Sequence, residues 1–126
     1  MNITYNPELP ITDYVPDRIP TLNKNGRRYL AEMIQKDSKV PIKKLDMYDY
    51  YILRKESYRQ NLIEEVLTNP QLKMTTIGSN DEKLLRNILR NPNFLLRNLS
   101  NAFARFETDD FYIEVHNGKI TELCYR

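Results

Sequence analysis

The chain contains few of the residues on which most catalytic and metal sites depend. Its 126 residues include one cysteine, one histidine and three glycines. Cys124 alone cannot form an intramolecular disulfide, which fits a reducing compartment. His116 and Cys124 cannot complete a zinc site, and the three glycines lie too far apart for a phosphate-binding loop. We therefore expect a protein that is not an enzyme and that carries no cofactor and no metal.

Long apolar runs are also missing. No window approaches the ~18 consecutive apolar residues of a transmembrane helix. The first ten residues, MNITYNPELP, have neither the basic start nor the apolar run of a signal peptide. We expect no membrane partner, and a protein that is cytoplasmic or held within a particle assembled in the cytoplasm. With 40% hydrophobic and 29% charged residues, the composition is that of an ordinary globular domain.

Proline is concentrated at the N-terminus, where four of the seven prolines fall within the first twenty residues. Because proline fixes φ and removes a backbone donor, this segment cannot form a helix interior or a central strand. Apolar side chains alternate with the prolines, so a freely solvated tail is not expected. We predict an extended arm at residues 1–20 and a single domain at 21–126. The arm would contact its own domain or a partner through Tyr5, Leu9, Ile11 and Tyr14.

Helical spacing of apolar residues predicts four helices after the arm. Asn-Pro pairs end the second helix and separate the third from the fourth, because proline disfavours helical geometry in the residue before it. A capping box that begins at Ser79 starts the third. The predicted helices cover about residues 26–37, 46–68, 80–90 and 92–106, and a linker at 38–44 separates the first two.

Strands are predicted at residues 72–77, which are apolar and β-branched, and on both sides of Asn117-Gly118. An Asn-Gly pair is a strong signal for a two-residue type I′ turn. Regular alternation would pair Val115 with Ile120, Ile113 with Glu122, Phe111 with Cys124 and Tyr112 with Leu123. An isolated hairpin is marginal in water, so we expect a third strand from residues 72–77 or from the N-terminal NITY. The predicted fold class is α+β, with about four helices, a small antiparallel sheet and the extended arm.

Cationic residues form two blocks, although the net charge of the chain is only +2. Residues 24–44 hold seven cationic side chains and two acidic ones, and residues 83–106 hold five cationic side chains and no acidic one. On the predicted helices, the second block places leucine on one side and arginine and asparagine on the other. The residues expected to meet a protein or a phosphate are Arg27, Arg28, Lys43, Lys44, Arg86, Arg90, Arg97, Asn101 and Arg105.

Three interpretations of this Arg/Asn face stay open. Solvated faces of helices are usually charged. Arginine and tyrosine are also enriched at protein interfaces. Arginine and asparagine can contact phosphates and base edges, and the tyrosines at 48, 50, 51 and 58 could stack on bases. No helix-turn-helix spacing, RNP-type strand or zinc finger accompanies the charge.

An acidic group near the C-terminus is the one candidate for a hard-cation or nuclease-like site. Its spacing matches no known motif, and it is typical of a polar connection between a helix and a strand. The group consists of Glu107, Asp109, Asp110 and Glu114, with Lys119 across the predicted hairpin.

From these features we expect a small, non-enzymatic protein-interaction or assembly module that docks onto a larger protein or onto copies of itself. A virus- or phage-encoded structural component, or a host-targeting inhibitor, would fit this description. The alternative is a nucleic-acid-binding protein that uses the basic segment 24–44 and the Arg/Asn face of helices 80–106.

Overall fold

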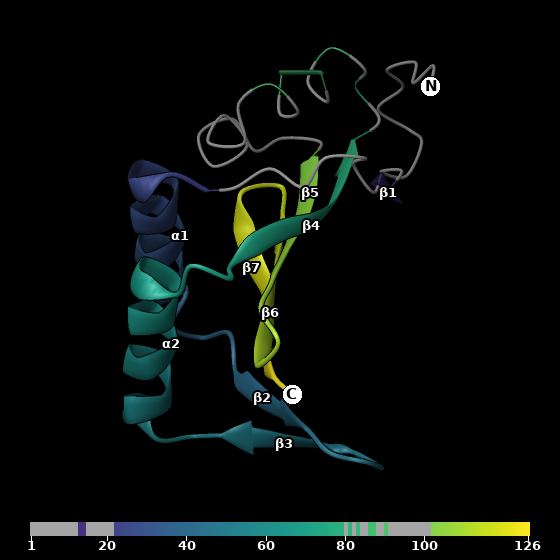
Figure 1. Ribbon diagram of the computed structural model, residues 1–126. Coiled ribbons are helices and arrows are strands. Elements are labelled where there is room, and N and C mark those ends of the chain that lie inside the picture. The colour runs from purple at the N-terminus through teal and green to yellow at the C-terminus, as the bar shows by residue number, and fades with distance from the viewer. Residues whose placement is uncertain are drawn as a thin grey trace.

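The computed structural model describes residues 13–14, 22–79, 81, 83, 86, 87, 90 and 102–126. These residues form two layers (Figure 1). The helices α1 (Lys24–Lys36) and α2 (Glu56–Thr68) lie side by side on one face of a sheet. No described helix covers the opposite face, which we call the open face. Within the described part of the chain, neither helix has the length and apolar composition needed to cross a membrane.

The sheet is mixed. Six strands follow the order β4-β5-β6-β7-β2-β3, and the two-residue strand β1 joins at the β4 edge. Neighbouring strands are antiparallel except β2 and β7, which are parallel. The strands are β1 (Asp13–Tyr14), β2 (Ile42–Leu45), β3 (Tyr50–Leu53), β4 (Lys73–Ser79), β5 (Ala102–Glu107), β6 (Phe111–His116) and β7 (Lys119–Tyr125).

Helix α1 agrees with the first predicted helix. Asn23 caps its start, because its Oδ1 accepts a hydrogen bond from the Gly26 N–H at 2.8 Å and satisfies a donor that the helix leaves free. Leu30 and Ile34 are one turn apart and fully buried. After the helix ends, Asp37 Oδ2 accepts from the backbone N–H of Ile120 at 3.1 Å, which ties this end of α1 to β7.

Two arginines join the helices, each bonding near the C-terminal end of the other helix. Arg27 of α1 donates to the carbonyls of Val66 and Asn69 at 3.1 and 2.6 Å. Arg59 of α2, which is only 6% exposed, donates to the carbonyl of Ile34 at 3.0 Å. Because the last carbonyls of a helix have no partner within it, the two guanidinium groups satisfy acceptors that the helices leave open.

The core lies between the helices and the sheet and draws on almost every element. Its largest fully buried side chains come from both helices, from β4 to β7 and from the connection before β4. They are Leu30, Ile34, Leu62, Leu72, Met74, Ile77, Phe106, Phe111, Ile113 and Leu123.

The hairpin of β6 and β7 turns at Asn117 and Gly118, as predicted. Their φ angles of 50° and 82° fit a type I′ turn. Val115 pairs with Ile120, also as predicted. Beyond that pair a bulge at Thr121 shifts the register, so that Ile113 pairs with Leu123 and not with Glu122.

The bulge has a physical cause in the spacing of β7. Ile120 and Leu123 are both buried, but three positions separate them, and regular alternation would turn one of them to the open face. One extra residue in β7 brings both to the buried face. The remaining predicted pairs are wrong for this reason, since Phe111 pairs with Tyr125 and Tyr112 with Cys124.

The predicted fold of about four helices and a small antiparallel sheet is wrong, because the described residues form two helices and a larger mixed sheet. The predicted helix at 46–68 is half wrong: residues 50–53 form β3, and α2 begins only at Glu56. The side chains of Asp46 and Asp49 each accept from the next backbone N–H, and such local bonds compete with helix formation.

Two further corrections concern strands. The predicted linker at 38–44 is wrong at its end, because Ile42 begins β2. The predicted fourth helix is wrong over residues 102–106. They belong to β5, in which buried and partly exposed residues alternate strictly, the period of a strand. The strand predicted at 72–77 is confirmed over residues 73–77, which belong to β4. Residues 92–101 and most of the predicted helix 80–90 lie outside the described residues.

Candidate interaction surface

The most unusual exposed element is the hairpin of β2 and β3, residues 42–53, which we call the ribbon. It lies at one edge of the sheet, and its turn points away from the helices (Figure 1). The Asp46 N–H donates to the carbonyl of Asp49 at 2.9 Å and closes the turn. Both aspartate side chains also bond to the backbone, to Met47 N at 2.8 Å and to Tyr50 N at 3.0 Å. Three hydrogen bonds therefore hold the conformation of the turn, although the two residues at its tip, Met47 and Tyr48, are exposed.

The ribbon carries most of the exposed large apolar side chains of the described residues. Six of these eight side chains lie between positions 45 and 52, and the two at the turn are the most exposed, Met47 at 81% and Tyr48 at 91%. Exposed apolar side chains gathered in this way are typical of interaction sites. We call the six residues the ribbon surface: Leu45, Met47, Tyr48, Tyr50, Tyr51 and Ile52.

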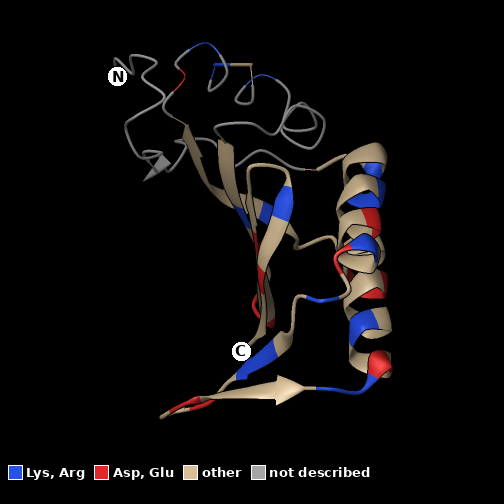
Figure 2. Ribbon diagram, turned by 180° about the vertical axis from the view of Figure 1, so that it is seen from behind, with Lys and Arg blue, Asp and Glu red and all other residues tan. Residues whose placement is uncertain are grey.

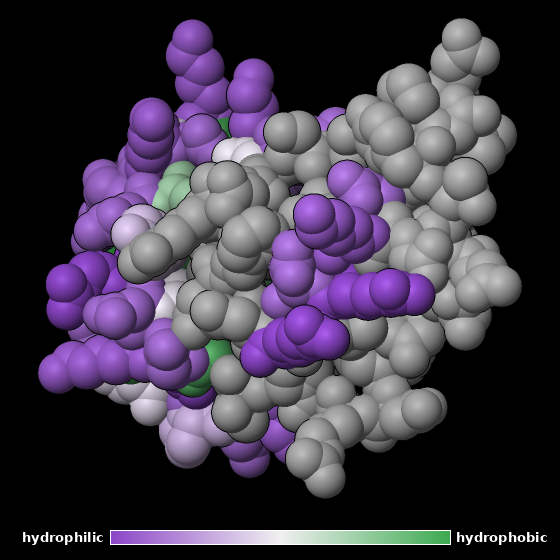
Figure 3. All heavy atoms as spheres, turned by 90° about the horizontal axis from the view of Figure 1, so that it is seen from above, coloured by the Kyte–Doolittle hydropathy of each residue, from purple (hydrophilic) through white to green (hydrophobic). Residues whose placement is uncertain are grey.

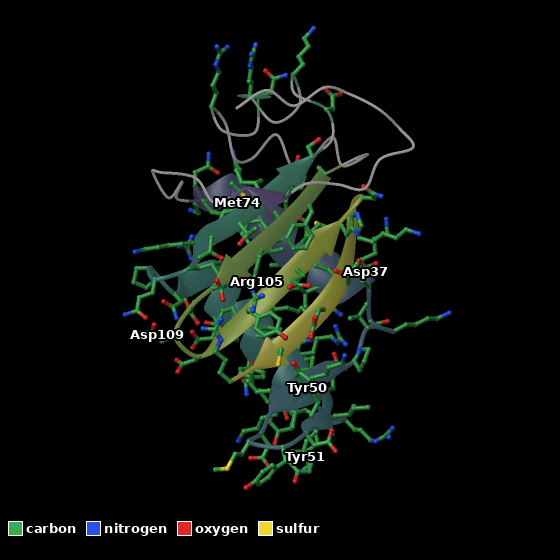
Figure 4. The ribbon with its side chains drawn as sticks, turned by 90° about the vertical axis from the view of Figure 1, so that its right-hand side faces the viewer. Asp37, Tyr50, Tyr51, Met74, Arg105 and Asp109 are labelled. Carbon is green, nitrogen blue, oxygen red and sulfur yellow. The ribbon has the colours of Figure 1, made fainter. Side chains whose placement is uncertain are left out.

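The two faces of the ribbon differ. Lys43 pairs with Ile52, and its ammonium lies 5.5 Å from the ring centroid of Tyr50, so these three side chains share the open face. Tyr51 alternates to the other face of the strand. In Figure 4, which looks onto the open face, the labelled Tyr50 and Tyr51 lie at the ribbon end of the molecule.

The base of the ribbon is anchored in the core. Ile42 is 2% exposed and pairs in parallel with the buried Leu123 of β7. Arg59 donates to the carbonyls of Ser38 and Val40 at 3.2 and 2.5 Å, which fixes the chain just before β2. The ribbon surface is thus exposed on a support that is itself rigidly packed.

The centre of the open face is polar and internally paired. Arg105 of β5 lies 3.3 Å from both Glu107 and Glu114, and its guanidinium carbon is 4.0 Å from the ring centroid of Tyr112. Thr75 donates to Glu107 at 2.5 Å, and Arg126 also pairs with that carboxylate. Figure 4 shows Arg105 in the middle of this face.

These contacts shift two pKa values. Burial alone raises the pKa of Glu107, but the hydrogen bond from Thr75 and the charges of Arg105 and Arg126 outweigh it and hold the pKa below its usual value. Burial raises the pKa of Tyr112 well above its ordinary value, and its hydrogen bond to Glu122 at 2.7 Å adds to the rise. The side chain of Tyr50, on the ribbon, adds to this rise as well.

A groove of about 550 Å³ lies on the helix side, between α2, the base of the ribbon and the C-terminal residues. Carboxylates and cations both line it, so it presents no surface of one charge. Tyr125 lines it as well, and burial together with the nearby Glu65 raises the pKa of its hydroxyl to about 12. The lining residues are Lys44, Leu53, Tyr58, Asn61, Glu64, Glu65, Asp110, Phe111, Tyr125 and Arg126.

The structure separates the basic residues that the sequence grouped together. Arg27 bonds near the end of α2, and Arg28 is exposed on α1. Lys43 and Lys44 lie on the ribbon instead. Figure 2 shows Lys and Arg interspersed with Asp and Glu along both helices. The cations of segment 24–44 are thus divided between α1, the connection after it and the ribbon.

The second basic block is only partly described. Arg86 and Arg90 have exposed side chains, whereas Arg97 and Asn101 lie outside the described residues. Arg105 does not sit on a helix with them, because it belongs to β5 and pairs with Glu107 and Glu114. Figure 3, which looks onto the end of the molecule opposite the ribbon, shows mainly hydrophilic side chains among the described residues.

The predicted arm contacts cannot be followed at Tyr5, Leu9 and Ile11, which lie outside the described residues. Tyr14 belongs to β1, where its backbone pairs with Ile77 of β4. This pairing places two residues of segment 1–20 at the sheet edge opposite the ribbon.

The acidic group near the C-terminus does not converge on one point. Glu107 and Glu114 bind Arg105, while Asp109 and Asp110 are exposed in the turn between β5 and β6. Within the described residues, no three His, Cys, Asp or Glu side chains are placed to hold a metal ion together.

The ribbon surface was missed in the sequence because its tyrosines also fit helical spacing. Asp46 and Asp49 flank the pair Met47-Tyr48, and the aromatic and β-branched run YYIL follows directly after Asp49. This combination is typical of a short hairpin.

Comparison with known proteins finds no matching family model, no matching curated protein and no matching solved structure.

Proposed function

We propose that the chain is a small protein-binding or assembly module, without catalysis of its own, that docks through the ribbon surface. The observation that carries the proposal is the clustering of six exposed apolar side chains within eight consecutive residues, 45–52. Tyrosine and methionine are both enriched at protein interfaces, and tyrosine buries a large area at a modest cost in side-chain entropy.

The support of the ribbon favours binding over a passive role. Ile42 and Arg59 hold its base, and Asp46 and Asp49 hold its turn. A surface that is already ordered loses less conformational entropy when a partner binds. Holding these exposed side chains in place would add little to the stability of the folded chain if they never left water.

The described basic residues support protein docking more than nucleic-acid binding. Arg105 is neutralised by two carboxylates, and Arg27 is committed to backbone carbonyls of α2 and of Asn69 just beyond it. Binding to nucleic acid requires cations that are free to neutralise its phosphates and so displace the counterions condensed on them. The described cations therefore offer little of the continuous surface that such binding uses.

The experiment compares partner recovery by the wild type and by a ribbon variant, Met47→Ser, Tyr48→Ser and Tyr51→Ser combined. Both tagged proteins would be purified from the cells that produce the chain, after circular dichroism has shown equal folding. We expect the ribbon variant to lose specific partners, or further copies of the chain, that the wild type retains. The control Leu67→Ser removes an exposed apolar side chain from α2 and should retain them. Equal recovery by the wild type and the ribbon variant would refute the proposal.

A further inference from the structure

We infer that the partner of the ribbon is a second copy of this chain, and that two β3 strands pair antiparallel across a two-fold axis to form one continuous sheet. The inference rests on the proposed function and names the occupant of the same surface. Its starting point is that β3 is the last strand in the sheet order, so among the described residues it pairs with β2 alone.

The edge of β3 lacks the usual protection against pairing. Natural edge strands carry a proline, a charge or a bulge that blocks a further strand. The segment YYIL contains none of these, and its pairing with β2 is regular. Three of its four side chains are exposed: Tyr50 at 48%, Tyr51 at 58% and Ile52 at 50%.

The backbone of β3 is oriented for an added strand. Asp46 and Asp49 form a hydrogen-bonded pair at the turn, and hydrogen-bonded and non-bonded pairs alternate along an antiparallel ladder. The backbone groups of Tyr51 therefore face β2, whereas those of Tyr50 and Ile52 face outward. A second strand would meet an alternating row of open donors and acceptors.

Charge along the ribbon selects the antiparallel direction. Figure 2 shows acidic residues at the turn and basic residues where β3 continues into α2. These are Asp46 and Asp49 at the turn, and Arg54 and Lys55 at the base. Antiparallel pairing brings the acidic turn of one copy beside the basic base of the other. Parallel pairing would place like charges side by side, which is destabilising.

The same charges select the register. A two-fold axis perpendicular to the sheet keeps each face on its own side, so only registers that pair residues of one face are allowed. With Ile52 opposite Ile52 of the second copy, Asp49 lies opposite Lys55 and Tyr50 opposite Arg54. The register centred on Tyr51 instead places Asp49 opposite Leu53, where its charge has no partner. The register centred on Tyr50 pairs Asp46 with Arg54, but it sets half of β3 against the turn residues Met47 and Tyr48, which lie outside the strand. We therefore assign the two-fold axis to Ile52.

This arrangement also accounts for the most exposed residues. Continuing the register, the turn of one ribbon lies beside the first residues of α2 in the other copy. Met47 and Tyr48, which are 81% and 91% exposed in the single chain, would then lie against a neighbouring surface. The two copies would thus bring the exposed residues of β3 and of the turn to one interface.

The test is sedimentation equilibrium of the purified full chain from about 1 μM to about 1 mM, the range in which weak specific dimers dissociate. We expect a monomer–dimer equilibrium in the wild type. Ile52→Lys would place two ammonium groups opposite each other at the axis and should weaken dimerisation at least about tenfold. The control Leu67→Lys adds the same charge on α2 and should leave the dimer intact.

A charge exchange tests the register. Asp49→Lys and Lys55→Asp should each weaken the dimer, because each places like charges opposite one another. The double variant should restore the dimer. A merely local effect of either substitution, on the turn or on α2, would instead persist in the double variant. A wild type that stays monomeric throughout, or a double variant that dimerises more weakly than both single variants, would overturn the inference.

If the pure chain is monomeric but its ribbon still recovers a different protein from cells, the proposed function stands and self-pairing falls. If ribbon substitutions affect neither, both fall.

Discussion

Arg59 donates a hydrogen bond to the carbonyl of Ile34 over 3.0 Å, so the second helix caps the first. The same guanidinium reaches the carbonyls of Ser38 and Val40. One buried cation therefore fixes the path from α1 into β2, and with it the position of the ribbon.

Replacing Arg59 by alanine should lower the free energy of unfolding by about 3 kcal/mol, because one buried and two partly buried carbonyls lose their donor. Urea denaturation followed by circular dichroism measures this change. Arg54→Ala removes an exposed arginine from the connection between β3 and α2 and should stay within about 0.5 kcal/mol of the wild type. Equal effects of the two substitutions would contradict the role given to Arg59.

The carboxylate of Glu107 should make stability depend on acid pH. Its pKa is lower in the folded chain than in the unfolded one, so the unfolded state takes up a proton first as the pH falls. The stabilisation is complete above the unfolded pKa and is lost as the pH drops through the folded value.

Glu107→Gln should therefore flatten the acid limb of the stability curve below about pH 5, measured by urea denaturation at a series of pH values. The effect should be moderate, because the side chain is partly exposed to solvent. Glu64→Gln, a change to an exposed carboxylate of α2, serves as the control and should leave the limb unchanged. A wild-type curve that runs parallel to that of Glu107→Gln would show that the pairing contributes nothing.

The bulge at Thr121 should be dispensable. Deleting Thr121 leaves Ile120 opposite Val115 and Leu123 opposite Ile113, as in the intact chain, and restores regular alternation between them. We expect the free energy of unfolding to fall by less than about 1 kcal/mol, as measured by urea denaturation.

Deletion of Glu114 from β6 is the matched comparison. It would turn Ile113 and Phe111, both fully buried, towards the open face, and should unfold the chain or cost several times more. If the Thr121 deletion proved as damaging, the extra residue would have a role beyond register.

Local signals predicted some elements well. Asn117-Gly118 specifies its turn through backbone conformations that these two residues adopt readily, and Leu30 and Ile34 specify α1 through helical spacing. Both signals act over a few residues and need no tertiary information.

The errors arose where the spacing of apolar residues in a short segment fits both the period of a helix and the period of a strand. Tyr48, Tyr51 and Ile52 fit a helical stripe, but the aspartates around the turn favour a hairpin through their backbone bonds. Phe103 and Phe106 fit a helix as well, yet Ala102, Ala104 and Phe106 alternate as a strand paired on both sides. Pairing with distant strands decides such cases, and it cannot be derived from the local sequence.

The candidate site was the least predictable part. Arg105 was placed on a basic helical face, but it lies on a strand, between Glu107 of the same strand and Glu114 of the neighbouring strand β6. The ribbon surface depends on β2 pairing in parallel with β7, the last strand of the chain. That long-range contact leaves β3 at the edge and its side chains uncovered.

The central claim is that the ribbon surface meets a protein. Site-specific photo-cross-linking tests it most directly, with a benzophenone side chain placed at Tyr48 in one variant and at Lys119, in the hairpin of β6 and β7, in another. We predict discrete protein adducts from position 48, either with a second copy of the chain or with another protein, and none from position 119. Absence of adducts at position 48, or equal adducts at both positions, would contradict the account.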